Sequence, residues 1–428
     1  MPQAIISGFR PFTKRFYRYY WLVSGVNGTI CAKTFLFERC LLSVMHLVTA
    51  TWFVAALSEV FTAKFEKICP AKHPQLVKMA TISSHEMRTP RLFFADDNPD
   101  IDMKHYPEKV CFEKLGCFTD EIAGTVPTAP ANINPFYSFN ELNKFPVNVS
   151  WNASETKLSE IAAHLFDRER SLVIVAHGFG ESLRKQWPWD LSEALLIAYK
   201  GDAVTMLIDW SRGSYLPLYA RAASNVQLVA KMTVKLVQRL MAAFPTIKAN
   251  NIHFVGFSLG GQMSGYFARQ FFNATGERIG HVTALDTAAP HFEHLGIMPK
   301  RGDADFVEAI HTSASGNILT GKVGIIEPYG DIDFYPNGGV KQPGCSIIQL
   351  ACSHKRAFVL YTHALLEADH CQMKGKRCQN VSEANEGKCN GTDIDAYIGM
   401  LRSPTLKKQD DDFHIVYFKT NGQVPFCS

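Results

Sequence analysis

The feature that most constrains this chain is the stretch 252–261, which reads Ile-His-Phe-Val-Gly-Phe-Ser-Leu-Gly-Gly. An apolar run leads into a Gly-x-Ser-x-Gly motif centred on Ser258, and a segment of small residues follows it. This order is typical of a strand, a sharp turn and a helix, in which the turn holds a serine in strained backbone geometry. Glycines fit at positions 256 and 260 because a Cβ there would collide with the neighbouring strand or helix. The motif alone arises by chance in about one chain in ten of this length, so its context makes Ser258 the candidate nucleophile.

The region around this motif alternates between strand-like and helix-like patterns. Short apolar runs at 172–176, 203–208, 252–255, 281–285 and 307–310 predict strands. Between them, apolar residues at three- and four-residue spacing predict a helix over 220–244. Alternation of this kind predicts an α/β fold with a mostly parallel central sheet that helices cover on both faces.

The first 106 residues have a different character. Residues 1–58 carry a net charge of +5, and no charged residue lies between Arg39 and Glu59. The uncharged run 40–58 fits a secretory signal peptide, or else a signal-anchor that leaves a type II membrane protein with its catalytic domain outside the cytosol. Residues 59–106 are polar and interrupted by prolines, which predicts a linker or propeptide-like arm. The regular pattern occupies 107–428, which we expect to be the folded domain.

Two further features indicate a secreted protein. Five N-x-Ser/Thr sequons follow the apolar run and are candidate glycosylation sites, at Asn148, Asn152, Asn273, Asn380 and Asn390. Eight of the eleven cysteines lie from Cys111 onward, an even number that suits disulfides in an oxidising compartment. Their spacing favours small loops closed by Cys111 with Cys117 and by Cys345 with Cys352. The four remaining cysteines, at 371, 378, 389 and 427, allow three connectivities. No two-plus-two ligand spacing points to zinc.

A serine nucleophile needs a histidine as base and a carboxylate to orient that histidine. Asp286 directly follows the predicted strand 281–285, at the end where the serine turn lies, and is the candidate carboxylate. The base should follow it in the chain, which leaves seven histidines open at 291, 294, 311, 354, 363, 370 and 414. His354 stands out because the short Cys345–Cys352 loop would hold it in a rigid position.

The reaction also requires N–H donors for the oxyanion. The amide of Leu259, directly after the serine, is one candidate. Phe179 is the other, since the segment 176–180 follows a predicted strand with the sequence Ala-His-Gly-Phe-Gly. We expect His177 to make a structural hydrogen bond.

Eight motifs, in order across about 107–365, resemble the pancreatic-lipase family of α/β-hydrolases. They are Val-Cys-Phe-Glu-Lys-Leu-Gly-Cys-Phe at 110–118, His-Gly-Phe at 177–179, Asp-Trp at 209–210, Gly-Phe-Ser-Leu-Gly at 256–260, Leu-Asp-Thr-Ala-Ala-Pro at 285–290, Ile-His-Thr at 310–312, Asp-Phe-Tyr-Pro-Asn-Gly-Gly at 333–339 and Cys-Ser-His at 352–354. The resemblance implies an α/β-hydrolase fold, hydrolysis of lipid esters, and a triad of Ser258, Asp286 and His354.

Departures from the family pattern bear on the substrate. In this family the segment between the two cysteines before the histidine is the lid, and here it is reduced to 346–351, which resembles short-lid phospholipase A1 members. Phospholipase A1 members often shorten the segment between His311 and Asp333 as well. That segment is not shortened here, so it argues against the phospholipase A1 resemblance. Only 74 residues follow His354, too few for the family's C-terminal β-sandwich, so we expect none and no colipase dependence. Only Asp303 remains of the calcium pattern, so we expect no metal and no cofactor.

These observations favour a secreted ester hydrolase that acts on lipids at a membrane, micelle or lipoprotein surface, most simply as a phospholipase A1. A triacylglycerol or galactolipid lipase is the alternative within the same class. A non-catalytic yolk-type lipid-binding or storage protein is the alternative from another class, although the chain keeps all three triad residues. Nucleic acid is not an expected partner, because residues 59–428 carry no basic stripe interleaved with aromatic residues.

Overall fold

The computed structural model describes residues 108–293, 295–314, 323–346, 349, 351–401 and 414–427. The chain divides into two compact units, Met1–Asp102 and Met103–Ser428, and the description concerns the second by itself. The predictions for residues 1–58 and 59–106 fall outside the described residues. Within those residues, no helix has the length and apolar character needed to cross a membrane.

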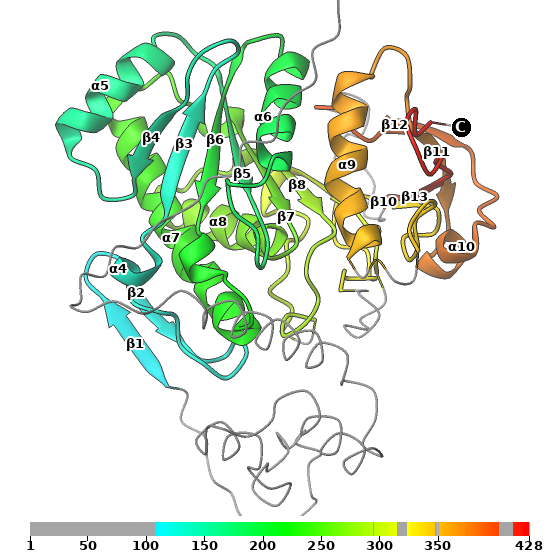
Figure 1. Ribbon diagram of the computed structural model, residues 1–428, viewed down its shortest axis with the longest axis horizontal. Helices are drawn as coiled ribbons and strands as arrows, with labels where there is room; N and C mark the ends of the chain where they lie inside the picture. Colours follow the sequence, from blue (N-terminus) through cyan, green and yellow to red (C-terminus); the bar gives the residue numbers. More distant parts are fainter. Residues whose placement is uncertain are drawn as a thin grey trace, which may run out of the picture. The chain divides into compact units, whose positions relative to one another are not determined.

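The second unit is built on an 11-stranded sheet in the order β12-β11-β13-β10-β9-β8-β7-β5-β6-β3-β4 (Figure 1). Its strands are β3 Phe136–Asn140, β4 Val147–Ser150, β5 Ser171–Ala176, β6 Ala203–Asp209, β7 Ile252–Phe257, β8 Ile279–Leu285, β9 Ala304–Ile310, β10 Ile332–Pro336, β11 Lys374–Cys378, β12 Asp393–Tyr397 and β13 His414–Phe418. A separate hairpin pairs β1 Lys109–Phe112 with β2 Gly116–Thr119.

The centre of the sheet is parallel, and this part confirms the sequence prediction. Strands β6, β5, β7, β8, β9, β10 and β13 pair in parallel, and five of them cover the five predicted runs. Both edges are antiparallel, through β3 with β4 and β6 and through β11 with β12 and β13. These edge strands were not predicted. Strand β11 reads Lys-Gly-Lys-Arg-Cys and has no apolar run. It is the second strand from the edge, between β12 and β13, and it is only partly buried.

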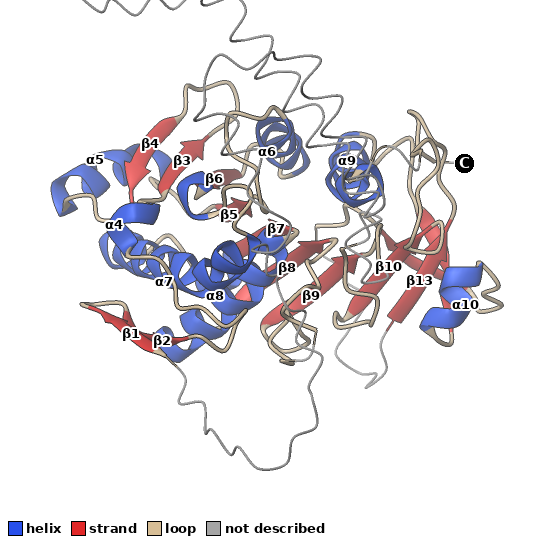
Figure 2. Ribbon diagram, turned by 60° about the horizontal axis from the view of Figure 1, so that its bottom comes forward, coloured by secondary structure: helices blue, strands red, loops and turns tan. Residues whose placement is uncertain are grey.

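Helices cover both faces of the sheet. The helices are α4 Pro130–Ile133, α5 Glu155–Leu165, α6 Trp187–Ala198, α7 Tyr219–Ala243, α8 Leu259–Thr275, α9 Cys352–Leu366 and α10 Val381–Glu386, with short 3₁₀ turns η1 Ser211–Gly213 and η2 Ala249–Asn251. Figure 2 shows α7 and α8 on one face and α6 and α9 on the other. The predicted helix 220–244 corresponds to α7 within one residue at each end.

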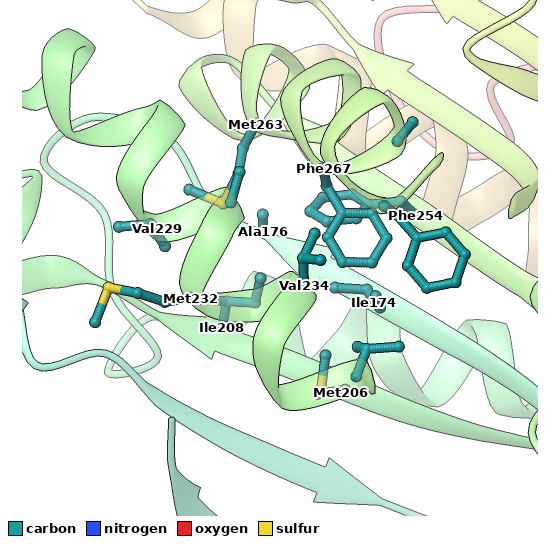
Figure 3. Packing of buried hydrophobic residues seen from close by; sticks show 14 of the residues in the cluster. Ile174, Ala176, Met206, Ile208, Val229, Met232, Val234, Phe254, Met263 and Phe267 are labelled. Carbon is teal, nitrogen blue, oxygen red and sulfur yellow. The ribbon is translucent and has the colours of Figure 1, made fainter. Parts of the chain in front are cut away.

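The core follows from alternation along the strands, since successive side chains point to opposite faces. On β5, Ile174 packs toward α7 and α8, whereas Val173 and Val175 pack toward α6 and α9. Figure 3 shows the first of these clusters, in which Phe254 of β7 lies beside Phe267 of α8. The α/β architecture with helices on both faces is therefore confirmed. The described residues after His354 form α9, α10 and strands of this same sheet, and they contain no separate β-sandwich.

The described residues contain four disulfides, and these include the two small loops expected from the sequence. Cys111–Cys117 joins β1 to β2, and Cys345–Cys352 closes the segment before α9. The other four cysteines pair as Cys371–Cys427 and Cys378–Cys389, which selects one of the three open connectivities. All five candidate glycosylation asparagines are exposed, and their glycosylation stays a prediction.

Candidate active site

The serine turn has the geometry that its sequence predicts. Ser258 stands between the end of β7 and the start of α8 with φ 58° and ψ −117°, a conformation that a non-glycine residue seldom adopts. A Cβ on Gly256 would lie 2.0 Å from the carbonyl oxygen of Gly260, and a Cβ on Gly260 would lie 2.2 Å from that of Ala176. The two glycines therefore permit the tight approach of strand, turn and helix that holds Ser258 in place.

Asp286 follows β8 and is completely buried. The backbone of the serine turn is tied to this strand, because Ser258 N–H donates to the carbonyl of Leu285 at 3.0 Å. Three groups donate to the Asp286 carboxylate: the backbone N–H of Thr312 at 2.7 Å, that of Ser313 at 3.0 Å, and the Ser313 hydroxyl. The carboxylate is thus fixed in one orientation by the segment that follows β9.

His354 lies in the first turn of α9, two residues after Cys352. Its Nδ1 is 2.5 Å from Oδ2 of Asp286, although the two residues are 68 positions apart. Its ring centroid is 4.6 Å from that of Phe257, the residue before Ser258. Among the described residues Nε2 of His354 has no hydrogen-bond partner. The structure therefore brings the three sequence candidates to one edge of the sheet and leaves one imidazole nitrogen available.

The electrostatics of this pair favour a charged carboxylate. Burial by itself would raise the pKa of Asp286, but its hydrogen bond to His354, the charge of that histidine and the donors of Ser313 and Thr312 hold the pKa below its usual range. An ionised Asp286 accepts the Nδ1 proton of His354, and this fixes the tautomer whose Nε2 is unprotonated. Such an imidazole can accept a proton from a hydroxyl.

The loop after β5 lies directly over the serine. A Cβ on Gly178 would be 2.6 Å from Cβ of Ser258, so the backbone there passes against the serine side chain. The next residue, Phe179, packs edge-on against Tyr219 at 5.1 Å. On the other side of the serine, Leu259 is the first residue of α8, whose N–H has no acceptor within the helix. Both proposed oxyanion donors therefore belong to segments that adjoin Ser258.

His177 supports this loop as the sequence suggested. Its Nδ1 lies 2.9 Å from the carbonyl oxygen of Gly178, and its Nε2 lies 3.3 Å from the backbone nitrogen of Trp210. The Trp210 indole N–H in turn donates to the His177 carbonyl at 2.9 Å. Both ring nitrogens are engaged with backbone groups, so the histidine joins the ends of β5 and β6.

Glu181 also holds this loop, a role that no sequence pattern predicted. Its buried carboxylate accepts the indole N–H of Trp187 at 3.1 Å and lies 3.5 Å from Nζ of Lys355. The Trp187 ring stacks on Phe358 of α9 at 4.4 Å and meets Phe257 edge-on. The loop that carries Phe179 is thereby connected to the helix that carries His354.

None of the other described histidines that follow Asp286 hydrogen-bonds to this aspartate. His291 is exposed and stacks with Tyr219, whereas His311 pairs with Asp333, and His294 lies outside the described residues. Asp303 is held by the Arg269 guanidinium and by the Lys300 N–H at 3.1 Å. Within the described ranges no group of three or more histidine, cysteine, aspartate or glutamate side chains could hold a metal ion.

Ser313 and Thr312 were also missed as part of the site. The only sequence signal was the Ile-His-Thr motif at 310–312, which ends at the carboxyl end of β9. Carboxyl ends of parallel strands share one edge of a sheet, so the motif indicated that Thr312 and Ser313 lie at the same edge as Asp286. Their contact with Asp286 depends on β8 and β9 being neighbours, which the motif does not specify.

Comparison with known proteins places this geometry in a family. A family model described as lipase matches residues 108–426. Pancreatic triacylglycerol lipase of Mus musculus is 31% identical over 312 residues, covering 66% of this chain and 64% of the relative. Pancreatic lipase-related protein 2 of Bos taurus is 29% identical over 310 residues with the same coverage. The chain thus spans 64% of the length of these curated relatives.

Solved structures give a weaker likeness. A dienelactone hydrolase from Anabaena variabilis is 18% identical and covers 33% of this chain and 62% of its own, with a TM-score of 0.24, which is too low to argue from. The family model matches far more than half of the chain, and its range includes every residue of the site described above. The chain therefore belongs to the lipase family and shares the pancreatic-lipase type of α/β-hydrolase fold.

Proposed function

We propose that this protein is a serine hydrolase of lipid esters, with phospholipids as preferred substrates and cleavage at the sn-1 position. The observation that carries the proposal is the contact of Nδ1 of His354 with buried Asp286 beside the strained serine turn. Relatives named as triacylglycerol lipases support hydrolysis of lipid esters in general.

The proposed reaction uses the three side chains in sequence. Ser258 Oγ attacks the acyl carbonyl while Nε2 of His354 takes the hydroxyl proton, and Asp286 stabilises the imidazolium. The N–H groups of Leu259 and Phe179 hold the oxyanion of the tetrahedral intermediate. His354 then gives its proton to the departing lysophospholipid oxygen, which leaves an acyl-serine. Water, deprotonated by the same histidine, hydrolyses this ester to the fatty acid and free Ser258.

The preference for phospholipids rests on the segment before His354. The Cys345–Cys352 disulfide closes a loop with only six residues between the cysteines, and the turn bonds Gln349 N–H to Ser346 O and Cys352 N–H to Gln349 O occupy this span. A loop of this length cannot form a long helical cover over the serine, so a bulky headgroup can approach. Colipase is not expected to be needed.

The test is hydrolysis of phosphatidylcholine and of a triacylglycerol, side by side, by the full chain with Ser258→Ala as control. We expect sn-1 fatty acid release from phosphatidylcholine and none from the control. Turnover of triacylglycerol alone would keep the triad and refute the argument from the short loop. If folded protein cleaves neither lipid and a fluorophosphonate fails to label Ser258, the enzyme proposal is wrong and a lipid-binding protein becomes the better reading.

A further inference from the structure

A ridge of exposed apolar side chains lies between η1 and α7. It consists of Tyr215, Leu216, Pro217 and Leu218, and we call these four residues the apolar ridge. Tyr215 is 53% exposed, Leu216 is 66% exposed and Leu218 is 46% exposed. Single exposed apolar residues are common on protein surfaces, but four in succession form a patch that calls for a partner.

The ridge is held in place by the loop that covers the serine. Gly180 N–H donates to the carbonyl of Ser214 at 2.6 Å, directly before the ridge. Leu216 lies against this loop, since a Cβ on Gly180 would be 3.2 Å from its Cγ. Directly after the ridge, the Tyr219 ring packs on Phe179. The ridge and the candidate oxyanion donor Phe179 are thus parts of one connected surface.

The direction of the strands places the ridge at the same edge of the sheet as the nucleophile. Strands β6, β5 and β7 are parallel, and their carboxyl ends lead to the ridge, to Phe179 and to Ser258 respectively. The connection from β3 to β4 lies at the opposite edge, because β3 runs antiparallel to β6. Phe145 in that connection is 95% exposed, which makes it a matched control position.

Four exposed cationic side chains lie on segments that flank the ridge in the chain or follow the loop that it contacts. Arg212 and Arg221 flank it in the chain, and Arg184 and Lys185 follow the loop that it contacts; all four are exposed. None of the four forms an ion pair within the part of the chain that the structure describes, and the segments 182–187 and 211–221 contain no acidic residue. Of the carboxylates beside these segments, Glu181 and Asp209 are buried. Burial and the charge of Glu293 raise the pKa of Tyr219. The four exposed cations outnumber Asp190 and Glu293, the two of these carboxylates that are not buried.

We propose that the apolar ridge and these four cations dock the protein on the surface of an anionic lipid bilayer, with Tyr215, Leu216 and Leu218 inserted below the headgroups. The inference rests on the proposed function, because docking here would bring Ser258 to the lipid. Apolar side chains bordered by arginine and lysine are the combination that binds anionic lipid surfaces, where each basic residue adds to the affinity. A purely apolar protein partner would leave the four cations without a role.

The test reports on the ridge itself. An environment-sensitive fluorescent amino acid is placed by amber suppression at position 216, or at position 145 as control, in the full chain carrying Ser258→Ala. Each protein is titrated with vesicles of phosphatidylcholine alone or with 30% phosphatidylserine. We expect a blue shift at position 216 with the anionic vesicles, a much smaller one with neutral vesicles, and none at position 145. The Arg212→Gln/Arg221→Gln variant should need about 30-fold more lipid for the same shift.

The outcomes separate this inference from the proposed function. No shift at position 216 with either vesicle overturns the docking surface, and equal shifts with both overturn its preference for anionic lipid. A shift that grows with protein concentration without vesicles identifies a second copy as the occupant and also overturns it. Hydrolysis of a soluble short-chain ester by protein with Ser258 intact tests the proposed function separately, because that substrate offers no surface.

Discussion

Two of the histidine–aspartate pairs in the described part of the chain, His354–Asp286 and His311–Asp333, use their second ring nitrogen differently. In one, Nδ1 of His354 contacts Asp286 at 2.5 Å, and Nε2 has no partner within the described residues. In the other, Nε2 of His311 contacts Asp333 at 2.9 Å, and Nδ1 is 2.8 Å from the carbonyl oxygen of Ile325.

This difference separates a candidate base from a structural residue. His311 is 1% exposed and stacks on Tyr335 at 4.3 Å, and each of its ring nitrogens lies against an oxygen acceptor, so neither nitrogen faces a hydroxyl whose proton it could take. His354 is 7% exposed, and its ring lies against that of Phe257, the residue before Ser258. A buried histidine beside an aspartate is therefore not by itself a sign of catalysis, and the environment of the remaining nitrogen decides.

The largest effect should come from His354→Ala. Without the base, ester turnover should fall by on the order of 10⁴-fold or more, because the serine keeps its proton. The midpoint of thermal unfolding should fall less than in His311→Ala, because the buried Asp286 carboxylate keeps three donors from Thr312 and Ser313. Turnover of a soluble ester and a thermal melt on the same sample provide the measurement. Turnover within tenfold of wild type would assign the base to another residue.

His311→Ala should show the reverse pattern. It leaves the Asp333 carboxylate buried with only the N–H groups of Tyr329 and Gly330 as donors. Breaking such a buried pair costs about 3–5 kcal/mol of the free energy of unfolding. Protein that remains folded should keep turnover within about tenfold. Urea unfolding followed by fluorescence measures the first effect. A variant as stable as wild type but without turnover would show that His311 takes part in the reaction, which would contradict its assignment as a structural residue.

Ser313→Ala sharpens the comparison from the side of Asp286. It removes the hydroxyl donor but keeps the Ser313 backbone N–H, so the carboxylate stays in place with one bond fewer. A hydrogen bond to a charged group contributes about 1.5–3 kcal/mol, which sets the expected fall in kcat at roughly 10- to 100-fold with KM unchanged.

The same variant carries a pH signature. The Ser313 hydroxyl helps to lower the pKa of Asp286, so its loss should raise that pKa toward the ordinary value. The stability that an ionised Asp286 contributes is fully present above its unfolded pKa and is lost as pH falls through its folded pKa. Acid unfolding of Ser313→Ala should therefore begin at higher pH than in wild type. An unshifted acid transition would show that the hydroxyl does not stabilise the charged carboxylate.

The smallest effect should come from Cys345→Ser/Cys352→Ser, which opens the loop before His354 without leaving a free thiol. If this loop positions the histidine, kcat should fall several-fold relative to wild type. The fall should be seen at denaturant concentrations below those that unfold the variant. The matched control is Cys111→Ser/Cys117→Ser, which opens the β1–β2 hairpin, remote in sequence from the triad. Equal turnover in both variants would mean that α9 holds His354 without help from the disulfide.

The sequence by itself determined the local geometry of this protein. The strand, the strained serine and the α8 helix follow from glycine at 256 and 260, and the central strands follow from apolar runs that are buried on both faces. Such patterns are readable because they fix the backbone of neighbouring residues. The polar strand β11, the second from the edge of the sheet, carries no such pattern, and it was missed for that reason.

Only the tertiary structure decided which distant residues meet. Asp286 and His354 are 68 positions apart, and their contact depends on α9 returning to the carboxyl edge of the sheet. The donors of Ser313, the Glu181 bridge and the place of the apolar ridge beside Phe179 likewise depend on the order of the strands. That order is set by the packing of the whole core, because a single segment can bury its apolar face only against segments far away in the chain.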